Sequence, residues 1–313
     1  ERSSKLILTA PPGAGKTTIV PLALLAAGKI KGRIIVLEPR RLAARAAAER
    51  MAQSLNEAAG DTVGYRMRGQ QKTSTQTRIE VVTEGTLTRM LQSDPELTGI
   101  GAVIFDEFHE RSLNADLGLA LCLEAASAFR EDLRILVMSA TLDVAPLVTL
   151  MQHPPVIAAE GRSFPVAPIW LDRPLPKLIK FETAICDLVL QALPQTSGAV
   201  LVFLPGEREI HKTAALLQSN LPRSCTVNTL FGAMRFEDQK AALAPALDTR
   251  KIILATAIAE TSLTIEGIRV VVDGGLARRA QYDPGSGMSR LITQRASKAE
   301  ATQRPGRAGR RDS

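Results

Sequence analysis

Short apolar runs alternate with longer helical patterns along the first half of the chain. The runs are rich in Ile, Val and Leu and occupy residues 6–8, 34–37, 79–82, 103–105 and 135–138. Between them, residues 42–55 and 113–128 are rich in Ala and Leu, with apolar positions at helical spacing. This alternation predicts βαβ units and a parallel sheet that is buried on both faces.

A second series of apolar runs follows at residues 200–204, 252–255 and 270–272. The stretch 153–178 between the two series is rich in proline, which disfavours both helix interiors and central strands. We interpret this stretch as a crossover. The chain is therefore predicted to be an α/β protein with two tandem domains, residues 1–160 and 161–313, each a mainly parallel sheet flanked by helices.

Polar or glycine-rich clusters follow nearly every predicted strand. They lie at residues 9–17, 38–41, 83–86, 106–109, 139–141, 205–206 and 256–264. In open parallel sheets, ligands bind outside the carboxyl ends of the strands. The clusters therefore predict a continuous functional surface along one edge of the sheets.

The first of these clusters has the composition of a phosphate-binding loop. Residues 10–18 read Ala-Pro-Pro-Gly-Ala-Gly-Lys-Thr-Thr and connect a predicted strand to a predicted helix. The two prolines lack an N–H group, so phosphate must be bound by the amides that follow. Lys16 is expected to reach the β- and γ-phosphates, and the Thr17 hydroxyl to bind Mg²⁺. The predicted nucleotide-binding residues are Gly13, Ala14, Gly15, Lys16, Thr17 and Thr18.

An acidic pair follows the apolar run 102–105. Asp106 is the expected Mg²⁺ anchor, and Glu107 the expected base that orients and polarises the attacking water. The alternative is a solvated acidic loop, which the strand exit and the phosphate-binding loop disfavour. His109 is assigned to coupling rather than to proton transfer. The pair and the loop together predict hydrolysis of ATP or another nucleoside triphosphate.

An arginine-rich segment near the end of the sequence complements this site. Arg307 and Arg310 are three residues apart and would share one helix face. Two guanidinium groups suit a phosphoryl group whose charge spreads in the transition state. An RNA-binding Arg-Gly tract or a solvated basic tail is the alternative for the same residues.

The composition of the chain limits the classes of molecule that it is expected to bind. A net charge of +7 favours a polyanion such as nucleic acid. The aromatic content of 4% argues against an extended base-stacking platform. The cysteines (Cys122, Cys186 and Cys225) are far apart and lack His neighbours, so we expect buried thiols in a reducing, cytoplasmic setting and no structural metal. No apolar stretch approaches the length of a membrane span.

These residues, in this order, resemble the conserved motifs of superfamily 2 helicases of the DEAH/RHA group. The similar segments are 10–18, 38–45, 83–87, 106–112, 139–141, 201–210, 256–268 and 303–310. They cover essentially the whole chain. Phe108 replaces the Ala of the group name, a form of the box that is typical of one bacterial branch.

The resemblance implies two RecA-like P-loop NTPase domains, with ATP between them and single-stranded nucleic acid across them. It implies 3′–5′ translocation and unwinding by a monomer, and we expect RNA as the strand, although no residue decides between RNA and DNA. Further nucleotide contacts are implied for Arg40, Ser262 and Glu266, water positioning for Gln303, and coupling for Ser139 and Thr141. The implied nucleic-acid contacts are Arg41, Arg66, Arg68, Thr86 and Thr264.

The sequence departs from the family pattern at several positions. Ala257 stands where Asn is usual, and Leu243 stands where relatives carry a Phe that stacks on the base opposite an Arg, here Arg40. A Leu offers no π-face, so weak base selectivity is expected. The family's C-terminal accessory domains are not in this sequence, whose abrupt ends suggest part of a longer protein.

Other functions were weighed for the same residues. A P-loop switch that binds nucleotide without turnover would not need Glu107, Gln303 and both arginines together. A passive basic nucleic-acid-binding protein would not need Lys16, Thr17 and Asp106. A DNA-directed ATPase, or one that remodels protein complexes without strand separation, remains the alternative to an RNA helicase.

Overall fold

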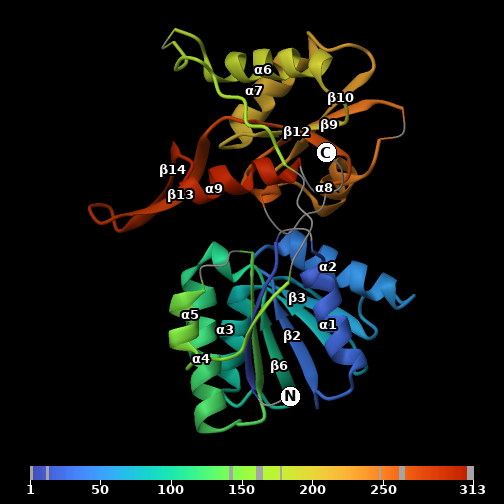
Figure 1. The fold of residues 1–313 in the computed structure, drawn as a ribbon, viewed down its shortest axis with the longest axis vertical. Coiled ribbons are helices and arrows are strands. Elements are labelled where there is room, and N and C mark those ends of the chain that lie inside the picture. Colours follow the sequence, from blue (N-terminus) through green and yellow to red (C-terminus); the bar gives the residue numbers. More distant parts are fainter. Residues whose placement is uncertain are drawn as a thin grey trace. The chain divides into compact units, whose positions relative to one another are not determined.

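The computed structural model describes residues 3–11, 14–140, 144–159, 165–176, 178–246, 248–260 and 265–308. The chain divides into two compact units, Glu1–Arg162 and Ser163–Ser313. In Figure 1 the first unit is coloured from blue to green and the second from yellow-green to red. Each unit has its own sheet and its own apolar core.

Unit 1 is built around an eight-stranded sheet of order β4-β3-β5-β2-β6-β7-β1-β8. Neighbouring strands pair in parallel except β3 and β4, which are antiparallel. The strands are β1 (Lys5–Thr9), β2 (Arg33–Leu37), β3 (Val63–Met67), β4 (Gln70–Lys72), β5 (Ile79–Val82), β6 (Ile100–Phe105), β7 (Arg134–Ser139) and β8 (Val156–Ala158). The central strands are fully buried, as expected for a parallel sheet that is covered on both faces.

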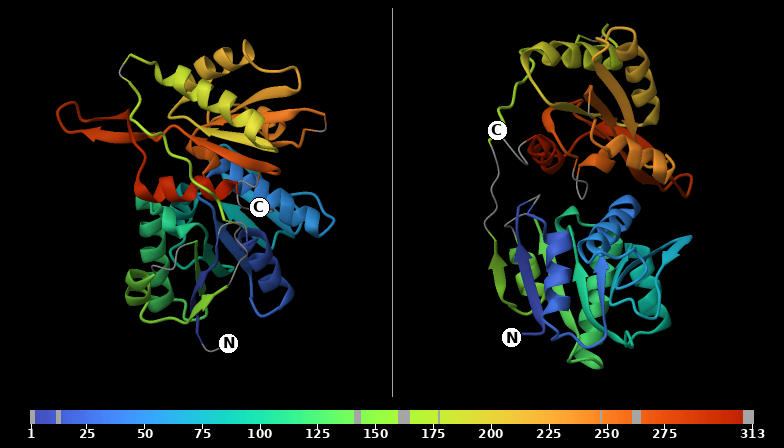
Figure 2. Two further views of the ribbon diagram at one scale, coloured as in Figure 1. Left: turned by 45° about the horizontal axis from the view of Figure 1, so that its top comes forward. Right: turned by 90° about the vertical axis from the view of Figure 1, so that its right-hand side faces the viewer.

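Helices cover both faces of this sheet (Figures 1 and 2). They are α1 (Lys16–Ala26), α2 (Arg41–Ser54), α3 (Glu84–Ser93), α4 (Leu113–Ala128) and α5 (Ala145–Leu150), with a short 3-10 helix, η1, at Phe108–Glu110. Successive strand residues point to opposite faces. Ile34 and Val36 therefore pack in the core beneath α1 and α2, whereas Ile35 and Leu37 pack in the core beneath α3, α4 and α5.

Unit 2 has a four-stranded parallel sheet of order β10-β11-β9-β12 and a separate antiparallel hairpin, β13-β14. The strands are β9 (Ala199–Phe203), β10 (Cys225–Leu230), β11 (Arg250–Ala255), β12 (Ile268–Asp273), β13 (Leu276–Asp283) and β14 (Met288–Arg295). The helices are α6 (Phe181–Gln195), α7 (Glu207–Gln218), α8 (Phe236–Leu243) and α9 (Lys298–Gln303), with the 3-10 helices η2 (Ala257–Ala259) and η3 (Pro305–Arg307).

In unit 2, too, helices pack apolar side chains against the sheet. Ile185 and Val189 of α6 pack with Ile210 of α7 against Val200 and Val202 of β9. The long hairpin β13-β14 is largely exposed, and it is the red ribbon that projects from the unit in Figures 1 and 2. The predicted apolar runs therefore all form strands of the two sheets, although the run 270–272 forms the edge strand β12.

The predicted crossover contains one element that the sequence pattern does not indicate. Val156–Ala158 form β8, which pairs in parallel with β1 at the edge of the unit 1 sheet. The prediction of a crossover over 153–178 is therefore wrong for these residues. β8 is short and exposed, and Pro154 and Pro155 precede it. It therefore lacks the long apolar run by which a central strand is recognised in a sequence.

Candidate functional site

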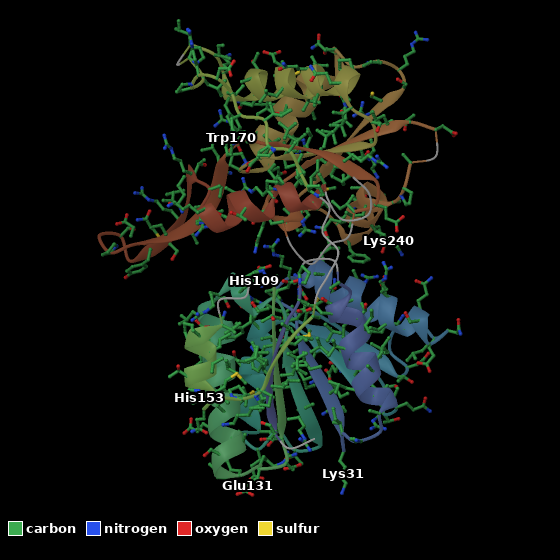
Figure 3. The ribbon with its side chains drawn as sticks, viewed as in Figure 1. Lys31, His109, Glu131, His153, Trp170 and Lys240 are labelled. Carbon is green, nitrogen blue, oxygen red and sulfur yellow. The ribbon has the colours of Figure 1, made fainter. Side chains whose placement is uncertain are left out.

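The carboxyl ends of the unit 1 strands form the edge where His109 lies, whereas Lys31 and Glu131 lie at the opposite edge (Figure 3). Strands β6, β7 and β1 are consecutive in the sheet order. The loop after β1 and the acidic cluster after β6 are therefore separated by only one strand. This topology brings together segments that are far apart in the sequence.

The loop after β1 turns sharply into α1. Gly15 precedes the helix with φ +75°, in the left-handed region that favours glycine. A Cβ atom there would lie 2.8 Å from Ile19 Cδ1. In this conformation the N–H of Ala14 donates to Pro11 O at 3.3 Å, and the N–H of Thr18 to Gly15 O at 3.1 Å. The turn places Lys16 and Thr17 at the helix N-terminus, whose partial positive charge favours phosphate.

Two contacts join this loop to the acidic pair. The Thr17 hydroxyl donates a hydrogen bond to Asp106 Oδ2. The Nζ atom of buried Lys16 lies 3.5 Å from Oε1 of buried Glu107. A hydroxyl, two carboxylates and an ammonium group are thereby assembled beside the helix N-terminus, an arrangement able to bind a triphosphate and its metal ion.

Asp106 is in an electrostatically unfavourable position without a cation. Burial and the neighbouring Glu107 together raise the pKa of Asp106 to about 7, against the opposing effects of Lys16 and Thr17. Its Oδ1 atom accepts the Glu107 N–H at 2.8 Å. Carboxylate and hydroxyl oxygens are ligands suited to Mg²⁺, and a divalent cation would favour the ionised carboxylate. Thr17 and Asp106 therefore fit a magnesium site.

Glu107 adopts a strained backbone conformation with φ +49°, which costs a non-glycine residue about 1 kcal/mol or more. Its carboxylate contacts two side chains: Oε1 faces Lys16, and Oε2 lies 3.4 Å from Nε2 of His109. Such strain persists only where the surroundings fix the backbone. Here it directs the Glu107 carboxylate toward the phosphate-binding loop instead of away from it.

His109 connects this carboxylate to the next strand exit. Its Nδ1 atom accepts the N–H of Ala140 at 3.2 Å, so the ring proton lies on Nε2, which faces Glu107. Burial lowers the pKa of His109, and the neutral ring is favoured. Ala140 directly follows Ser139, the last residue of β7 and itself buried.

Phe108, which directly follows the acidic pair, packs in the apolar core of unit 1. Phe108 is buried, with its ring edge-to-face against Phe105 at 6.0 Å between centroids. The Arg111 guanidinium lies 5.7 Å from the Phe108 ring centroid and also pairs with Asp116. Phe108 thus belongs to the core of unit 1 and not to the polar site.

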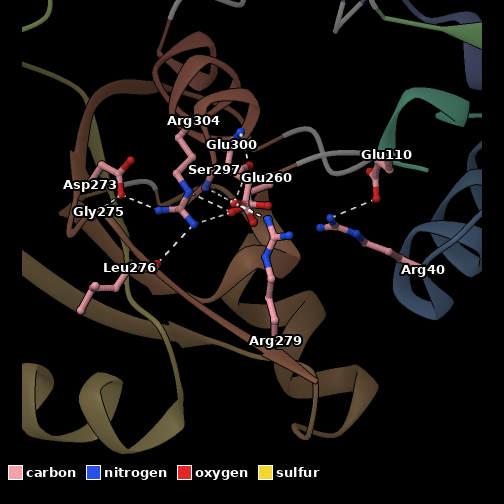
Figure 4. A network of polar contacts seen from close by, with 10 residues as sticks. All are labelled: Arg40, Glu110, Glu260, Asp273, Gly275, Leu276, Arg279, Ser297, Glu300 and Arg304. Carbon is pink, nitrogen blue, oxygen red and sulfur yellow. Dashed lines mark hydrogen bonds and ion pairs between the residues drawn. The ribbon is translucent and has the colours of Figure 1, made fainter. Parts of the chain in front are cut away.

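Arg40 forms an ion pair with Glu110, with 3.2 Å between Nη2 and Oε2 (Figure 4). Arg40 precedes α2, and Glu110 ends η1. The contact joins the exits of β2 and β6, which are neighbours in the sheet. It places the guanidinium group predicted to contact the base at the same sheet edge as the acidic pair.

Unit 2 contains a cavity of about 700 Å³ that gathers three residues singled out in the sequence. Leu243, Glu266 and Arg307 all line it, although they come from α8, the segment before β12 and η3. Gln303 is the last residue of α9 and is half-buried. Three residues predicted from the sequence to lie near the nucleotide therefore line one cavity of unit 2.

A buried arginine network in unit 2 was not predicted. Arg304 is fully buried and bonds Glu260 through Nε at 2.8 Å and Asp273 through Nη1 at 2.6 Å (Figure 4). It also donates to Leu276 O at 3.3 Å. Arg304 thereby ties the arginine-rich segment to η2 and to the end of β12. A buried arginine requires carboxylate partners, but the sequence alone does not say which carboxylates lie nearby.

Three of the predicted nucleic-acid contacts lie together in unit 1. A groove of about 700 Å³, here called the α3 groove, is lined by Arg33, Arg66, Met67, Arg68, Gly69, Gln71, Thr83, Gly85, Thr86, Arg89, Met90, Ser93, Asp94, Leu97, Thr98 and Ile100. It contains Arg66, Arg68 and Thr86. Arg41 is exposed at the first position of α2 and does not line the groove.

Five residues assigned from the sequence lie outside the described part of the chain: Gly13, Thr141, Ser262, Thr264 and Arg310.

The described residues also bear on metal binding, membrane association and thiols. Among them, no group of three His, Cys, Asp or Glu side chains is arranged to hold a metal ion. Within the same residues, no helix is both long and apolar enough to span a bilayer. Cys122 and Cys186 are buried as expected, but Cys225 is only half-buried.

Comparisons with known proteins give consistent matches to both units. Residues 1–149 match the DEAD/DEAH box helicase family, and residues 181–312 match the helicase conserved C-terminal domain. The chain is 54% identical over 307 residues to the ATP-dependent RNA helicase HrpB of Escherichia coli (strain K12), covering 98% of this chain and 38% of that protein. It is 36% identical over 312 residues to the ATP-dependent RNA helicase HrpA of Borreliella burgdorferi, covering 97% of this chain and 37% of that protein.

A solved structure agrees with these sequence matches. The crystal structure of the Escherichia coli DEAH/RHA helicase HrpB matches with a TM-score of 0.94 and 53% identity, covering 99% of this chain and 40% of that one. The chain therefore spans less than half the length of these relatives.

Proposed function

Because the chain belongs to the DEAD/DEAH box helicases, of the HrpB type, we propose that it couples nucleoside-triphosphate hydrolysis to 3′–5′ movement along single-stranded RNA. The family and the two-domain α/β fold predicted from the motifs are thereby confirmed. The similar HrpB and HrpA proteins are both named ATP-dependent RNA helicases, which favours RNA over DNA. We place this activity in two domains, residues 1–160 and 161–313, of a cytoplasmic monomer.

The observation that carries the proposal is the assembly of Lys16, Thr17, Asp106, Glu107 and His109 at one strand edge. Lys16 and the amides of the phosphate-binding loop, together with Thr18, bind the triphosphate. Thr17 and Asp106 hold magnesium, which when bound neutralises charge on the β- and γ-phosphates.

Glu107 orients the attacking water and accepts its proton in this proposal. Lys16 and His109 hold the carboxylate from either side. His109 carries the state of the site to Ser139 and Thr141 at the next strand exit, the first of them through the Ala140 N–H. Hydrolysis would thereby alter the segment that links the site to domain movement.

We also assign catalytic and nucleotide-binding roles to residues of unit 2. We assign charge stabilisation to Arg307 and Arg310, water positioning to Gln303, and nucleotide contact to Ser262 and Glu266. The cavity shared by Leu243, Glu266 and Arg307 supports a nucleotide-facing role for that surface. Arg304 supports Gln303 and Arg307 by anchoring the arginine-rich segment to Glu260 and Asp273.

The strand itself would be held through its backbone. Arg41, Arg66, Arg68, Thr86 and Thr264 supply guanidinium and hydroxyl donors for phosphate oxygens, which give affinity without base selection. The chain spans only 38% of the length of Escherichia coli HrpB. We therefore assign unwinding to the full-length protein, with accessory domains that close over the strand.

Phosphate release tests the proposal directly. The rate is measured with Mg²⁺ and ATP, first without nucleic acid and then with single-stranded RNA or single-stranded DNA of matched sequence. Stimulation by RNA above that by DNA is expected. Equal or greater stimulation by DNA would favour a DNA-directed enzyme, absence of stimulation would favour a remodelling ATPase, and absence of hydrolysis would refute the proposal.

A further inference from the structure

Two arginines that line the α3 groove, Arg33 and Arg66, pair with the same buried carboxylate. Glu80 lies on β5, between β3 and β2, and is fully buried. Its Oε1 atom is 2.6 Å from Arg66 Nε, and its Oε2 atom is 2.9 Å from Arg33 Nη1. The two arginine side chains are about one-third exposed. Glu80 therefore fixes guanidinium groups that are still accessible from the groove.

A polar stripe on α3 forms one wall of the groove. Thr83, Thr86 and Arg89 follow one another at a spacing of three residues, so they lie on one face of the helix. Ser93 continues this face one turn later. The stripe begins at the carboxyl edge of the sheet and leads toward Arg33, the first residue of β2 at the opposite edge.

The charges of the groove favour an anion. Arg33, Arg66, Arg68 and Arg89 line it together with one carboxylate, that of Asp94. The buried Glu80 carboxylate pairs with two of these arginines. Asp94 is already engaged, because its carboxylate accepts the Thr98 N–H at 2.7 Å. Within the described part of the chain, the guanidinium groups of Arg68 and Arg89 have no ion pair or hydrogen bond. Two arginines thus remain available to a ligand.

We propose that the α3 groove carries a further stretch of the single-stranded nucleic acid, with Arg89 as a phosphate contact and Glu80 as the positioning residue for Arg66. This inference rests on the proposed function and extends the strand path beyond Thr86. The ten residues of α3 rise by about 15 Å, and a stacked strand has about 3.4 Å between phosphates, so the groove accommodates more than one phosphate. Guanidinium and hydroxyl groups both donate to phosphate oxygens.

The salt dependence of RNA binding tests the role of Arg89. The Kd of a labelled oligouridylate is measured for the 313-residue chain over a range of salt concentrations, without nucleotide. Losing one phosphate contact lowers the slope of log affinity against log salt by about 0.7 for a single strand. Arg89→Ala should show this loss together with a severalfold higher Kd.

Arg50→Ala is the matched control. Arg50 is also an exposed helical arginine, but it lies on α2, which packs on the other face of the sheet. This variant makes the same change in net charge and should leave the slope unchanged. An equal loss of slope in both variants, or none in Arg89→Ala, would overturn the assignment. The latter result is expected if the groove instead receives a protein segment.

The variant Glu80→Gln distinguishes a role of Glu80 in positioning Arg66 from its contribution to the net charge. Removing a negative charge should strengthen RNA binding if Glu80 only contributes to the overall field. If Glu80 holds Arg66 in place, the same variant should bind RNA severalfold more weakly, although the protein has become more basic. Thermal unfolding verifies that the variant is folded, and Glu80→Asp, which keeps the charge, should restore part of the affinity.

These outcomes are separate from failure of the proposed function. If the parent chain neither binds RNA nor hydrolyses ATP, the proposed function fails first. If the parent binds and hydrolyses, but Arg89→Ala keeps its slope and Glu80→Gln binds RNA more tightly, only the inference about the α3 groove is overturned.

Discussion

The Nδ1 atom of His109 accepts a hydrogen bond from the backbone N–H of Ala140 at 3.2 Å. The opposite ring nitrogen lies 3.4 Å from the Glu107 carboxylate. One neutral imidazole therefore bridges the group proposed to activate water and the segment that follows β7. The contact gives a physical basis for coupling hydrolysis to movement, because a shift of either partner changes the other's hydrogen bond.

His109→Ala should reduce the stimulation of ATP hydrolysis by RNA more than it reduces the unstimulated rate. Loss of a coupling interaction typically corresponds to at least about a fivefold change. Phosphate release with and without RNA gives the ratio. His211→Ala is the control, since that histidine is exposed on α7 in unit 2. An unchanged ratio in His109→Ala would argue against coupling through this residue.

Asp106 should make the stability of the metal-free chain depend on pH. Its pKa is raised to about 7 in the folded protein, from an ordinary value of 3.8. Between these values the folded state binds more protons than the unfolded state, so the free energy of unfolding falls as pH rises.

Asp106→Asn should remove this pH dependence and, near pH 8, stabilise the metal-free chain by about 1 kcal/mol or more. Thermal unfolding in a chelator, across a series of pH values, provides the measurement. Asp61→Asn, at an exposed carboxylate, should behave like the parent. A variant that keeps the parental pH profile would show that Asp106 is not the group responsible.

Phe108 should matter for stability and not for chemistry. Its buried ring packs on Phe105, so Phe108→Ala is expected to lower the free energy of unfolding by about 3 kcal/mol. Phe129→Ala, at a ring that is 61% exposed, should cost much less. Chemical denaturation measures both changes. Hydrolysis per folded molecule should persist in Phe108→Ala, and its loss would place Phe108 in the catalytic machinery.

The sequence predicted those parts of the fold that depend on local pattern. The runs in β2 and β6 are continuously apolar, and the run in β5 is apolar except for Glu80; all three form buried central strands. The glycine-rich loop lies between β1 and α1, as predicted. The hairpin β13-β14 and the edge strand β10 were missed, because they contain many polar residues and lack an apolar pattern.

Contacts between segments that are distant in the chain could not be predicted from the sequence either. Glu80 lies within a run predicted to be a strand, but its pairing with Arg33 and Arg66 depends on the order of strands in the sheet. The Arg304 network similarly depends on how η2 and β12 pack. The acidic pair and the phosphate-binding loop were linked in advance only because both follow strands of one parallel sheet.

Leu243 should leave the enzyme with little base selectivity. It lines the unit 2 cavity together with Glu266 and Arg307, and an aliphatic side chain cannot stack on a base as an aromatic ring does. Values of kcat/KM for ATP, GTP, CTP and UTP should lie within about tenfold of one another, because stacking is worth about 1–3 kcal/mol per base. Leu243→Phe should lower KM for all four. A 100-fold preference of the parent for ATP would refute this role.

The central claim is that Glu107 activates water for hydrolysis of a nucleotide bound beside Lys16, Thr17 and Asp106. Glu107→Gln keeps the shape of the side chain and removes its basic oxygen. We predict that this variant binds ATP and Mg²⁺ with nearly the parental Kd, whereas RNA-stimulated phosphate release falls by about 100-fold or more. Parental turnover in Glu107→Gln, with nucleotide binding intact, would contradict the claim.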